Sequence, residues 1–184
     1  MDNLIYFRDG RMVAESGNIK AYSMDNQLFV EKGPGHTLLC SDLDKEQYIW
    51  LINDRPFGNC LVIGVGTGYV AKYLLTLRKV KHVVVVEENQ DLITVQSKIN
   101  SFNSNRIKVI KTEILPYLYK SSSRFDYIFI DCYNVVNEDT LPVIADIANG
   151  ARRLLSDRGI MTGWLDRDTE EVFVKPFYEI MGLN

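Results

Sequence analysis

The sequence predicts an α/β protein built on a doubly wound, mostly parallel β-sheet, with a small antiparallel β region before it. Over residues 59–181, short and continuously apolar stretches alternate with stretches of helical period, which is typical of a parallel sheet covered on both faces. Over residues 1–40, apolar and polar residues alternate in short stretches separated by turn signals. This change of pattern predicts an N-terminal β meander over residues 1–40 and an α/β domain over residues 41–184.

The N-terminal region is predicted to form short strands joined by tight turns. Asp9-Gly10, Ser16-Gly17-Asn18 and Asp25-Asn26 are the turn-forming sequences between them. A break that contains glycine and proline, at residues 31–37, ends the region. The predicted strands cover residues 4–7, 11–16, 18–23 and 27–32.

The α/β domain is predicted to begin with a helix and then to alternate strands with helices. The first helix covers residues 41–54, where Ser41 or Asp42 can cap the N-terminus and Tyr48 lies on the apolar face. The predicted strands that follow cover residues 61–65, 82–87, 107–110, 125–131 and 159–164. The predicted helices between and after them cover residues 69–77, 92–102, 115–119, 138–155 and 169–181.

The composition argues against several classes of protein. Of the 184 residues, 46% are hydrophobic and 24% charged, so the chain can bury a core and is not expected to be disordered. The net charge of −3 does not favour a nucleic-acid partner, and no apolar stretch reaches the roughly 20 residues of a membrane span. Three widely spaced cysteines and two histidines predict neither a disulfide framework nor a metal site. We therefore expect a cytoplasmic protein.

A glycine-rich turn follows the first strand of the α/β domain. Gly64, Gly66 and Gly68 have the spacing GxGxG, and Tyr69 stands where the third glycine of a dinucleotide-binding GxGxxG would fall. Glycine allows a ligand to approach the backbone closely, and the helix that follows offers free N–H groups. The shorter spacing favours a nucleoside ligand without a pyrophosphate. The alternative is a tight turn that binds nothing.

Three acidic positions follow the next strands. Glu87 ends the second strand, 23 positions after Gly64, where a carboxylate can accept both ribose hydroxyls; the alternative is a solvated charge. Glu113 follows the third strand, where it can accept from an adenine amine or simply favour a helix N-terminus. Asp131 closes the fourth strand and is either a catalytic group at the ligand edge or a loop cap.

These residues stand in motifs that resemble a known family. The segments LVIGVGTGYVAKYLL, VVVVEENQDLI, VIKTEILPYL and FDYIFIDCYN resemble, in order and spacing over residues 59–134, class I S-adenosylmethionine-dependent methyltransferases, and more narrowly the spermidine synthase branch. Asp44 and Tyr48 resemble that branch's Asp-x-x-x-Tyr. The resemblance implies a Rossmann-like domain that binds S-adenosylmethionine or its decarboxylated form.

The resemblance also implies roles for individual residues. It implies that the glycine turn binds the methionine and ribose portions of the ligand, and that the acids ending the second strand bind the ribose hydroxyls. It further implies that the two residues after the third strand bind adenine and that Asp131, with Tyr48, takes part in catalysis. The implied ligand-binding residues are Gly64, Val65, Gly66, Thr67, Gly68, Glu87, Glu88, Glu113, Ile114 and Asp131. Tyr133 and Trp164 are further candidates for an acceptor pocket.

The sequence departs from the family at three points. Asn134 stands where aminopropyltransferases carry a second acid, Thr67 stands where the turn usually carries an aspartate, and we expect the standard sixth and seventh strands to be absent. We therefore expect an S-adenosylmethionine-binding transferase that methylates a small molecule. The alternatives are a polyamine aminopropyltransferase and a non-catalytic module that binds a nucleoside or oligomerises. An uncovered sheet edge near residues 160–164 favours a homodimer.

Overall fold

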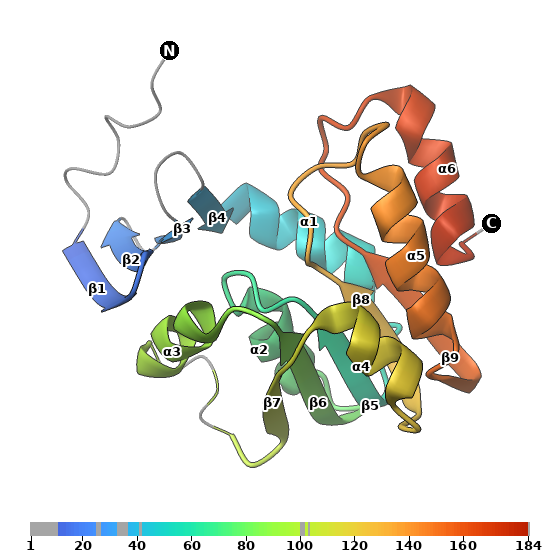
Figure 1. Ribbon diagram of the computed structural model, residues 1–184, viewed down its shortest axis with the longest axis horizontal. Coiled ribbons are helices and arrows are strands. Elements are labelled where there is room, and N and C mark those ends of the chain that lie inside the picture. The colour runs from blue at the N-terminus through green and yellow to red at the C-terminus, as the bar shows by residue number, and fades with distance from the viewer. Residues whose placement is uncertain are drawn as a thin grey trace.

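The structure is a computed structural model that describes residues 11–24, 27–32, 37–40, 42–99, 102 and 104–183 (Figure 1). An antiparallel sheet at the N-terminus contains, in spatial order, β1 (Arg11–Ser16), β2 (Ile19–Met24), β3 (Gln27–Lys32) and β4 (Thr37–Cys40). The alternating pattern predicted the first three of these strands. It did not predict β4, whose short sequence TLLC becomes a strand by pairing with β3. The strand expected at residues 4–7 lies outside the described residues.

The central sheet has five strands in the described residues, all parallel: β5 (Gly58–Ile63), β6 (Val80–Glu87), β7 (Ile107–Lys111), β8 (Phe125–Ile130) and β9 (Leu155–Gly163). Their order is β7-β6-β5-β8-β9, so the chain moves outward from β5 first in one direction and then in the other. This reversal between β5 and β8 is the place where doubly wound sheets bind ligands, beyond the carboxyl ends of the strands. The predicted fold class is therefore confirmed.

Helices cover both faces of the central sheet (Figure 1). Right-handed crossovers that run in opposite directions along a sheet place their helices on opposite faces. The helices α2 and α3 therefore share one face, and α4 and α5 share the other. The helices are α1 (Asp42–Ile52), α2 (Tyr69–Thr76), α3 (Gln90–Lys98), α4 (Ile114–Lys120), α5 (Leu141–Arg152) and α6 (Glu171–Met181). No helix in the described part of the chain is long and apolar enough to span a lipid bilayer.

The core lies along β5 and β8, the two strands at the centre of the sheet. Leu61, Ile63, Ile128 and Ile130 are completely buried, and apolar residues occupy consecutive positions because helices cover both faces. Burying a side chain of this size contributes about 1.5–3 kcal/mol. The core therefore fixes the carboxyl ends of β5 and β8 beside each other.

Five of the six predicted helices are shorter in the structure, and the one expected over residues 138–155 differs most. The helix expected over residues 138–155 begins at Leu141, because Asn137 and Thr140 exchange hydrogen bonds in the preceding turn: each residue's backbone N–H donates to the other's side-chain oxygen, at 3.0 Å. That helix ends at Arg152, and Leu155 already pairs with Phe125 in the sheet. The helix expected over residues 92–102 ends at Lys98.

The N-terminal sheet is anchored to α3. The Ser16 hydroxyl donates to Oδ1 of Asp91 at 2.7 Å, and Nζ of Lys98 donates to the carbonyl of Glu15 at 2.6 Å. Gly17, at the β1–β2 turn, has a φ of +52°, and a Cβ there would meet the Asp91 carboxylate. The helix that follows β6 thus supports the β1–β2 hairpin.

The outer edge of β9 has no strand beside it in the described residues. The homodimer expected from this edge stays a prediction, as do the domain boundaries at residues 40 and 41.

The Ser16–Asp91 hydrogen bond should contribute measurably to stability. A double-mutant cycle with Ser16→Ala and Asp91→Ala should give a coupling free energy of about 1 kcal/mol, because the partly buried hydroxyl loses a charged acceptor. Chemical denaturation of the wild type, the two single variants and the double variant measures this coupling free energy. Additive effects of the two substitutions would show that this bond does not hold the hairpin.

Candidate active site

The glycine-rich turn runs from the end of β5 to the start of α2, and its three glycines have positive φ. The φ angles of Gly64, Gly66 and Gly68 are +90°, +48° and +77°, values that residues with a Cβ rarely adopt. The Gly68 N–H donates to the Val65 carbonyl at 2.7 Å and closes the turn. A Cβ on Gly64 would overlap the Asp131 carbonyl, so this position requires glycine for space as well as for conformation.

Glu87, at the end of β6, holds the glycine turn from one side. It is only 7% exposed, and its Oε2 accepts from the Val65 N–H at 2.9 Å while its Oε1 accepts from the Asn89 N–H at 2.8 Å. A carboxylate has about four acceptor positions, so two hydrogen bonds leave capacity for a ligand's hydroxyls. Glu87 therefore lies where a ribose-binding acid was expected, and it also stabilises the turn.

Gln96 holds the same turn from α3 and was not predicted as a site residue. Its side chain is completely buried, and its Nε2 donates to the Gly66 carbonyl at 2.9 Å. Leu92 and Val95 are buried on the same face of α3. A glutamine at an otherwise apolar helical position was the signal in the sequence that could have revealed it.

Tyr48 and Asp131 meet although 83 positions separate them. Asp131 follows β8, and its N–H donates to the Ile63 carbonyl at 2.7 Å, which extends the pairing of β8 with β5. Tyr48 comes from α1, and its hydroxyl lies 3.1 Å from Oδ1 and 3.3 Å from Oδ2 of Asp131. A hydroxyl has one hydrogen, so the two carboxylate oxygens share this donor. The two predicted catalytic residues thus form one pair.

The Asp131 carboxyl has a perturbed proton affinity. Burial raises its pKa to about 7, because removal from water disfavours the charged form. The hydrogen bond from Tyr48 and the charge of Lys32 act in the opposite direction, and the charge of Glu87 raises the pKa further. Asp131 is therefore able to exchange a proton near neutral pH.

Aromatic rings surround the Tyr48–Asp131 pair. The ring centroid of Tyr48 lies 4.3 Å from that of Trp164, 5.7 Å from that of Tyr69 and 5.9 Å from that of Phe129. Tyr133 donates its hydroxyl to the Trp164 carbonyl at 2.7 Å, and burial raises its pKa well above the usual value. Trp164 therefore packs against Tyr48 of this pair, Tyr133 holds the backbone at that position, and a role of either residue in an acceptor pocket stays a prediction.

The other predicted residues lie at the same edge of the sheet with fewer contacts. Thr67 is buried within the glycine turn. Glu88 and Glu113 are exposed, and Ile114 is half-buried at the start of α4; the Glu113 side chain does not cap that helix. Asn134, three positions after Asp131, is exposed.

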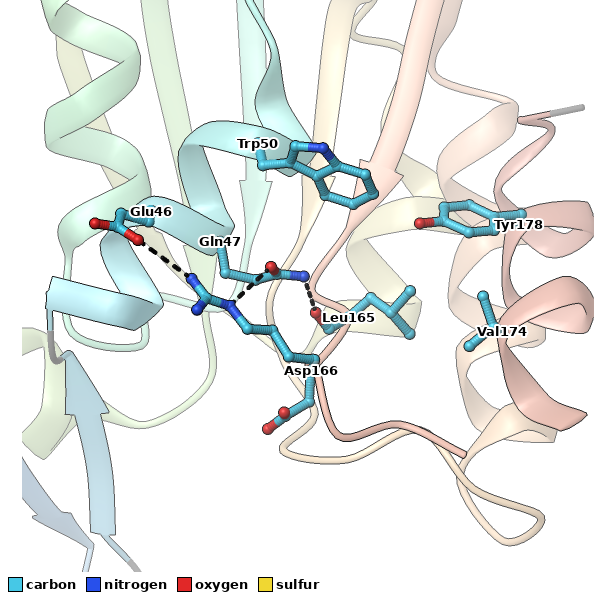
Figure 2. Close-up of a pocket in the computed structure, with 8 residues that line it drawn as sticks. Glu46, Gln47, Trp50, Leu165, Asp166, Val174 and Tyr178 are labelled. Atoms are coloured by element: carbon cyan, nitrogen blue, oxygen red, sulfur yellow. Dashed lines mark hydrogen bonds and ion pairs between the residues drawn. The ribbon is translucent and has the colours of Figure 1, made fainter. Parts of the chain in front are cut away.

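A groove of about 520 Å³ lies on the other side of α1 (Figure 2). Gln47 donates to the Leu165 carbonyl at 2.9 Å, and Arg167 donates to Oε1 of Gln47 at 3.2 Å, so polar contacts join α1 to the segment after β9. The groove is lined by Glu46, Gln47, Trp50, Leu165, Asp166, Arg167, Val174 and Tyr178. It contains none of the predicted ligand-binding residues, so the glycine turn and the groove are separate features.

Comparisons with known proteins agree with the fold. A polyamine aminopropyltransferase of Thermoplasma acidophilum is 26% identical over 115 residues, which cover 60% of this chain and 42% of that protein. The crystal structure of spermidine synthase from Thermotoga maritima matches with a TM-score of 0.65 at 15% identity, over 94% of this chain and 63% of that chain. This chain has the spermidine synthase-like, class I methyltransferase fold. No family model matches the sequence.

A second type of neighbour has the same fold. An S-adenosylmethionine-dependent methyltransferase from Clostridium acetobutylicum matches with a TM-score of 0.50 at 18% identity, over 66% of this chain and 50% of that chain. The present chain spans less than two thirds of the length of each of these three proteins. The resemblance of the sequence motifs to this fold is thus confirmed.

The close approach of β5 to β8 makes Gly64 intolerant of substitution. Gly64→Ala should destabilise the protein by about 1–3 kcal/mol more than Gly182→Ala, because the new methyl group must displace the Asp131 backbone. Gly182 is a matched control, since its φ is +73° and a Cβ there meets nothing within 4 Å. Chemical denaturation measures both effects. Equal losses of stability in the two variants would show that the cost of Gly64→Ala comes from the positive φ alone and not from the contact with Asp131.

The raised pKa of Asp131 predicts a specific dependence of stability on pH. The ordinary pKa of such a carboxyl is about 4, and the pKa of Asp131 in the folded protein is about 7. Between these two pH values the folded protein keeps a proton on Asp131 that the unfolded chain releases. The contribution of Asp131 to the free energy of unfolding should therefore fall as the pH rises through this window and level off above it. Comparing the wild type with Asp131→Asn across the window isolates this contribution.

Tyr48→Phe provides a control for the cause of the pH dependence. It removes a hydrogen bond that favours the charged carboxylate, so the midpoint of the Asp131-dependent change should move to higher pH. A difference between wild type and Asp131→Asn that is constant from pH 4 to pH 8 would contradict the assignment.

Proposed function

We propose that this chain binds an adenosyl sulfonium donor across the carboxyl ends of β5, β6 and β8 and transfers an alkyl group from it to a small molecule. The donor is S-adenosylmethionine or its decarboxylated form. The Tyr48–Asp131 pair carries the proposal, because it lies directly beside the glycine turn: a Cβ on Gly66 would come within 3.0 Å of Oδ2 of Asp131. A titratable pair and a ligand-binding turn thus share one site.

The residues of the turn fit such a donor. Glu87 keeps acceptor capacity for two ribose hydroxyls, with Glu88 next to it in the chain, and Glu113 and Ile114 follow the neighbouring strand where an adenine would lie. Gly66 has no side chain between the backbone of the turn and the Asp131 carboxylate, since a Cβ there would lie 3.0 Å from Oδ2 of Asp131. These roles are the ones that the resemblance of the sequence motifs implies for these positions.

The transfer itself needs alignment more than acid or base catalysis. When bound, the donor supplies a carbon activated by the sulfonium, and its C–S bond breaks with the electron pair going to sulfur as the acceptor's lone pair attacks. The chain's contribution is to align the acceptor and to exclude water, for which the rings of Tyr48 and Trp164 are suitably placed. An acceptor that arrives protonated can give its proton to Asp131, whose pKa of about 7 suits that task.

Methyl transfer is the activity that we propose first. Aminopropyl transfer is the second candidate, supported by the matching aminopropyltransferase and by the Tyr48–Asp131 pair. The exposed amide of Asn134 argues against it, because an amide neither accepts a proton nor offsets the charge of a polyamine. The non-catalytic module remains the third possibility.

Isothermal titration calorimetry with S-adenosylmethionine, decarboxylated S-adenosylmethionine and methylthioadenosine separates these proposals. Micromolar binding of the carboxylated donor is expected for methyl transfer, whereas preference for the decarboxylated donor supports aminopropyl transfer. Binding of methylthioadenosine alone supports the nucleoside-binding module. A protein that binds none of the three rules out both transferase proposals.

The ribose role of Glu87 needs a test that separates it from its structural hydrogen bonds. Wild-type protein should bind adenosine more tightly than 2′,3′-dideoxyadenosine by about 1–3 kcal/mol, and Glu87→Ala should lose this preference. The loss of the Val65 and Asn89 contacts affects both ligands alike, so the difference reports the hydroxyls alone. Calorimetry measures the four affinities. A preference that survives in Glu87→Ala would refute the role.

A further inference from the structure

The buried amide of Gln96 contacts one peptide group in the glycine turn. The contact joins Nε2 of Gln96 to the Gly66 carbonyl at 2.9 Å, across 30 positions of sequence. A carbonyl can only accept, so the NH₂ group must face it, and the direction of the amide is settled by its partner. Since the Gln96 side chain is completely buried, no water can take the place of this donor without rearrangement.

Fixing the Gly66 carbonyl also fixes the next N–H. In a trans peptide the C=O and the N–H point in opposite directions, and the structure has no cis peptide bond in its described residues. The Gly66 carbonyl points to α3, so the Thr67 N–H points away from α3. Within the described residues this N–H makes no hydrogen bond, which leaves a donor at the centre of the turn.

The turn is thus held at two neighbouring points by two different side chains. Glu87 holds Val65, and Gln96 holds Gly66. Gly66 is the turn residue whose Cβ position faces the Asp131 carboxylate, at 3.0 Å from Oδ2. A substitution that moves Gly66 is therefore expected to weaken binding of the ligand portion near Asp131, whereas a substitution of Glu87 is expected to weaken binding of the ribose.

We propose that Gln96 is a positioning residue that sets the Gly66–Thr67 peptide, so that the Thr67 N–H binds an acceptor group on the amino-acid tail of the donor. This inference rests on the proposed function, because it assumes an adenosyl donor with such a tail. A carboxylate is the acceptor that a free backbone N–H binds most strongly. Gln96 therefore favours the carboxylated donor.

The test compares Gln96→Met and Gln96→Glu with Gln90→Met. Methionine keeps the length of the side chain without a donor, and glutamate keeps the shape but turns an acceptor toward the Gly66 carbonyl. Gln90 lies on the same helix with an exposed side chain, so the same substitution there is a matched control. Thermal unfolding of each variant records any general loss of stability.

Amide hydrogen exchange of the ligand-free proteins is the first measurement. The Gly68 N–H, which closes the turn onto the Val65 carbonyl, should exchange about tenfold faster in Gln96→Met and in Gln96→Glu, because the turn loses its support. Exchange at Phe129, in the core of β8, should change only as much as global stability does. Gly68 exchange that only follows Phe129, or that matches Gln90→Met, would overturn the role of Gln96 in the turn.

Ligand titrations are the second measurement. Gln96→Met should bind S-adenosylmethionine about tenfold more weakly than wild type but adenosine nearly as well, since adenosine has no tail. Equal losses for both ligands, or no loss, would overturn the proposal. If the wild type binds neither ligand, the proposed function and the tail contact are both rejected, and the exchange result alone decides whether Gln96 holds the turn.

Discussion

The site depends on the contact between Gly64 and the backbone at Asp131. The parallel strands β5 and β8 are neighbours and end at the same edge of the sheet. Because Gly64 has no side chain, the backbone after β5 can touch the backbone after β8 there. With a Cβ in that place, the turn would have to move away from the carboxylate. Because the core residues on both sides of this contact are completely buried, the distance between turn and carboxylate is set by packing rather than by flexible side chains.

Two polar side chains at this edge hold the backbone of the glycine turn. Most buried polar groups in proteins are hydrogen-bonded, and Glu87 and Gln96 bond the backbone of the turn. The protein's own side chains thus hold the turn in place, and such preorganisation would reduce the entropy lost if the proposed donor binds there. The same helix that carries Gln96 also supports the β1–β2 hairpin through Asp91, so the N-terminal sheet and the turn share one support.

The sequence predicted the parts of the molecule in which one local pattern decides the structure. Continuous apolar strands, the glycine spacing and the acids at strand ends are such patterns, and they located β5 to β9, the turn, Glu87 and Asp131. The start of α5 depends on reciprocal side-chain bonds between Asn137 and Thr140, and β4 depends on its partner strand. The glutamine on the apolar face of α3 signals a buried polar contact, but the sequence does not identify the partner of Gln96, which is a backbone carbonyl that any residue carries.

The position of α1 explains how one helix serves two sides of the molecule. Tyr48 points to Asp131, whereas Gln47, the preceding residue, bonds the carbonyl of Leu165 on the side of the groove (Figure 2). Adjacent residues of a helix face directions about 100° apart, so these two contacts fix the rotation of α1 about its axis. The rotation of α1 in turn sets the position of the Tyr48 hydroxyl beside the Asp131 carboxylate.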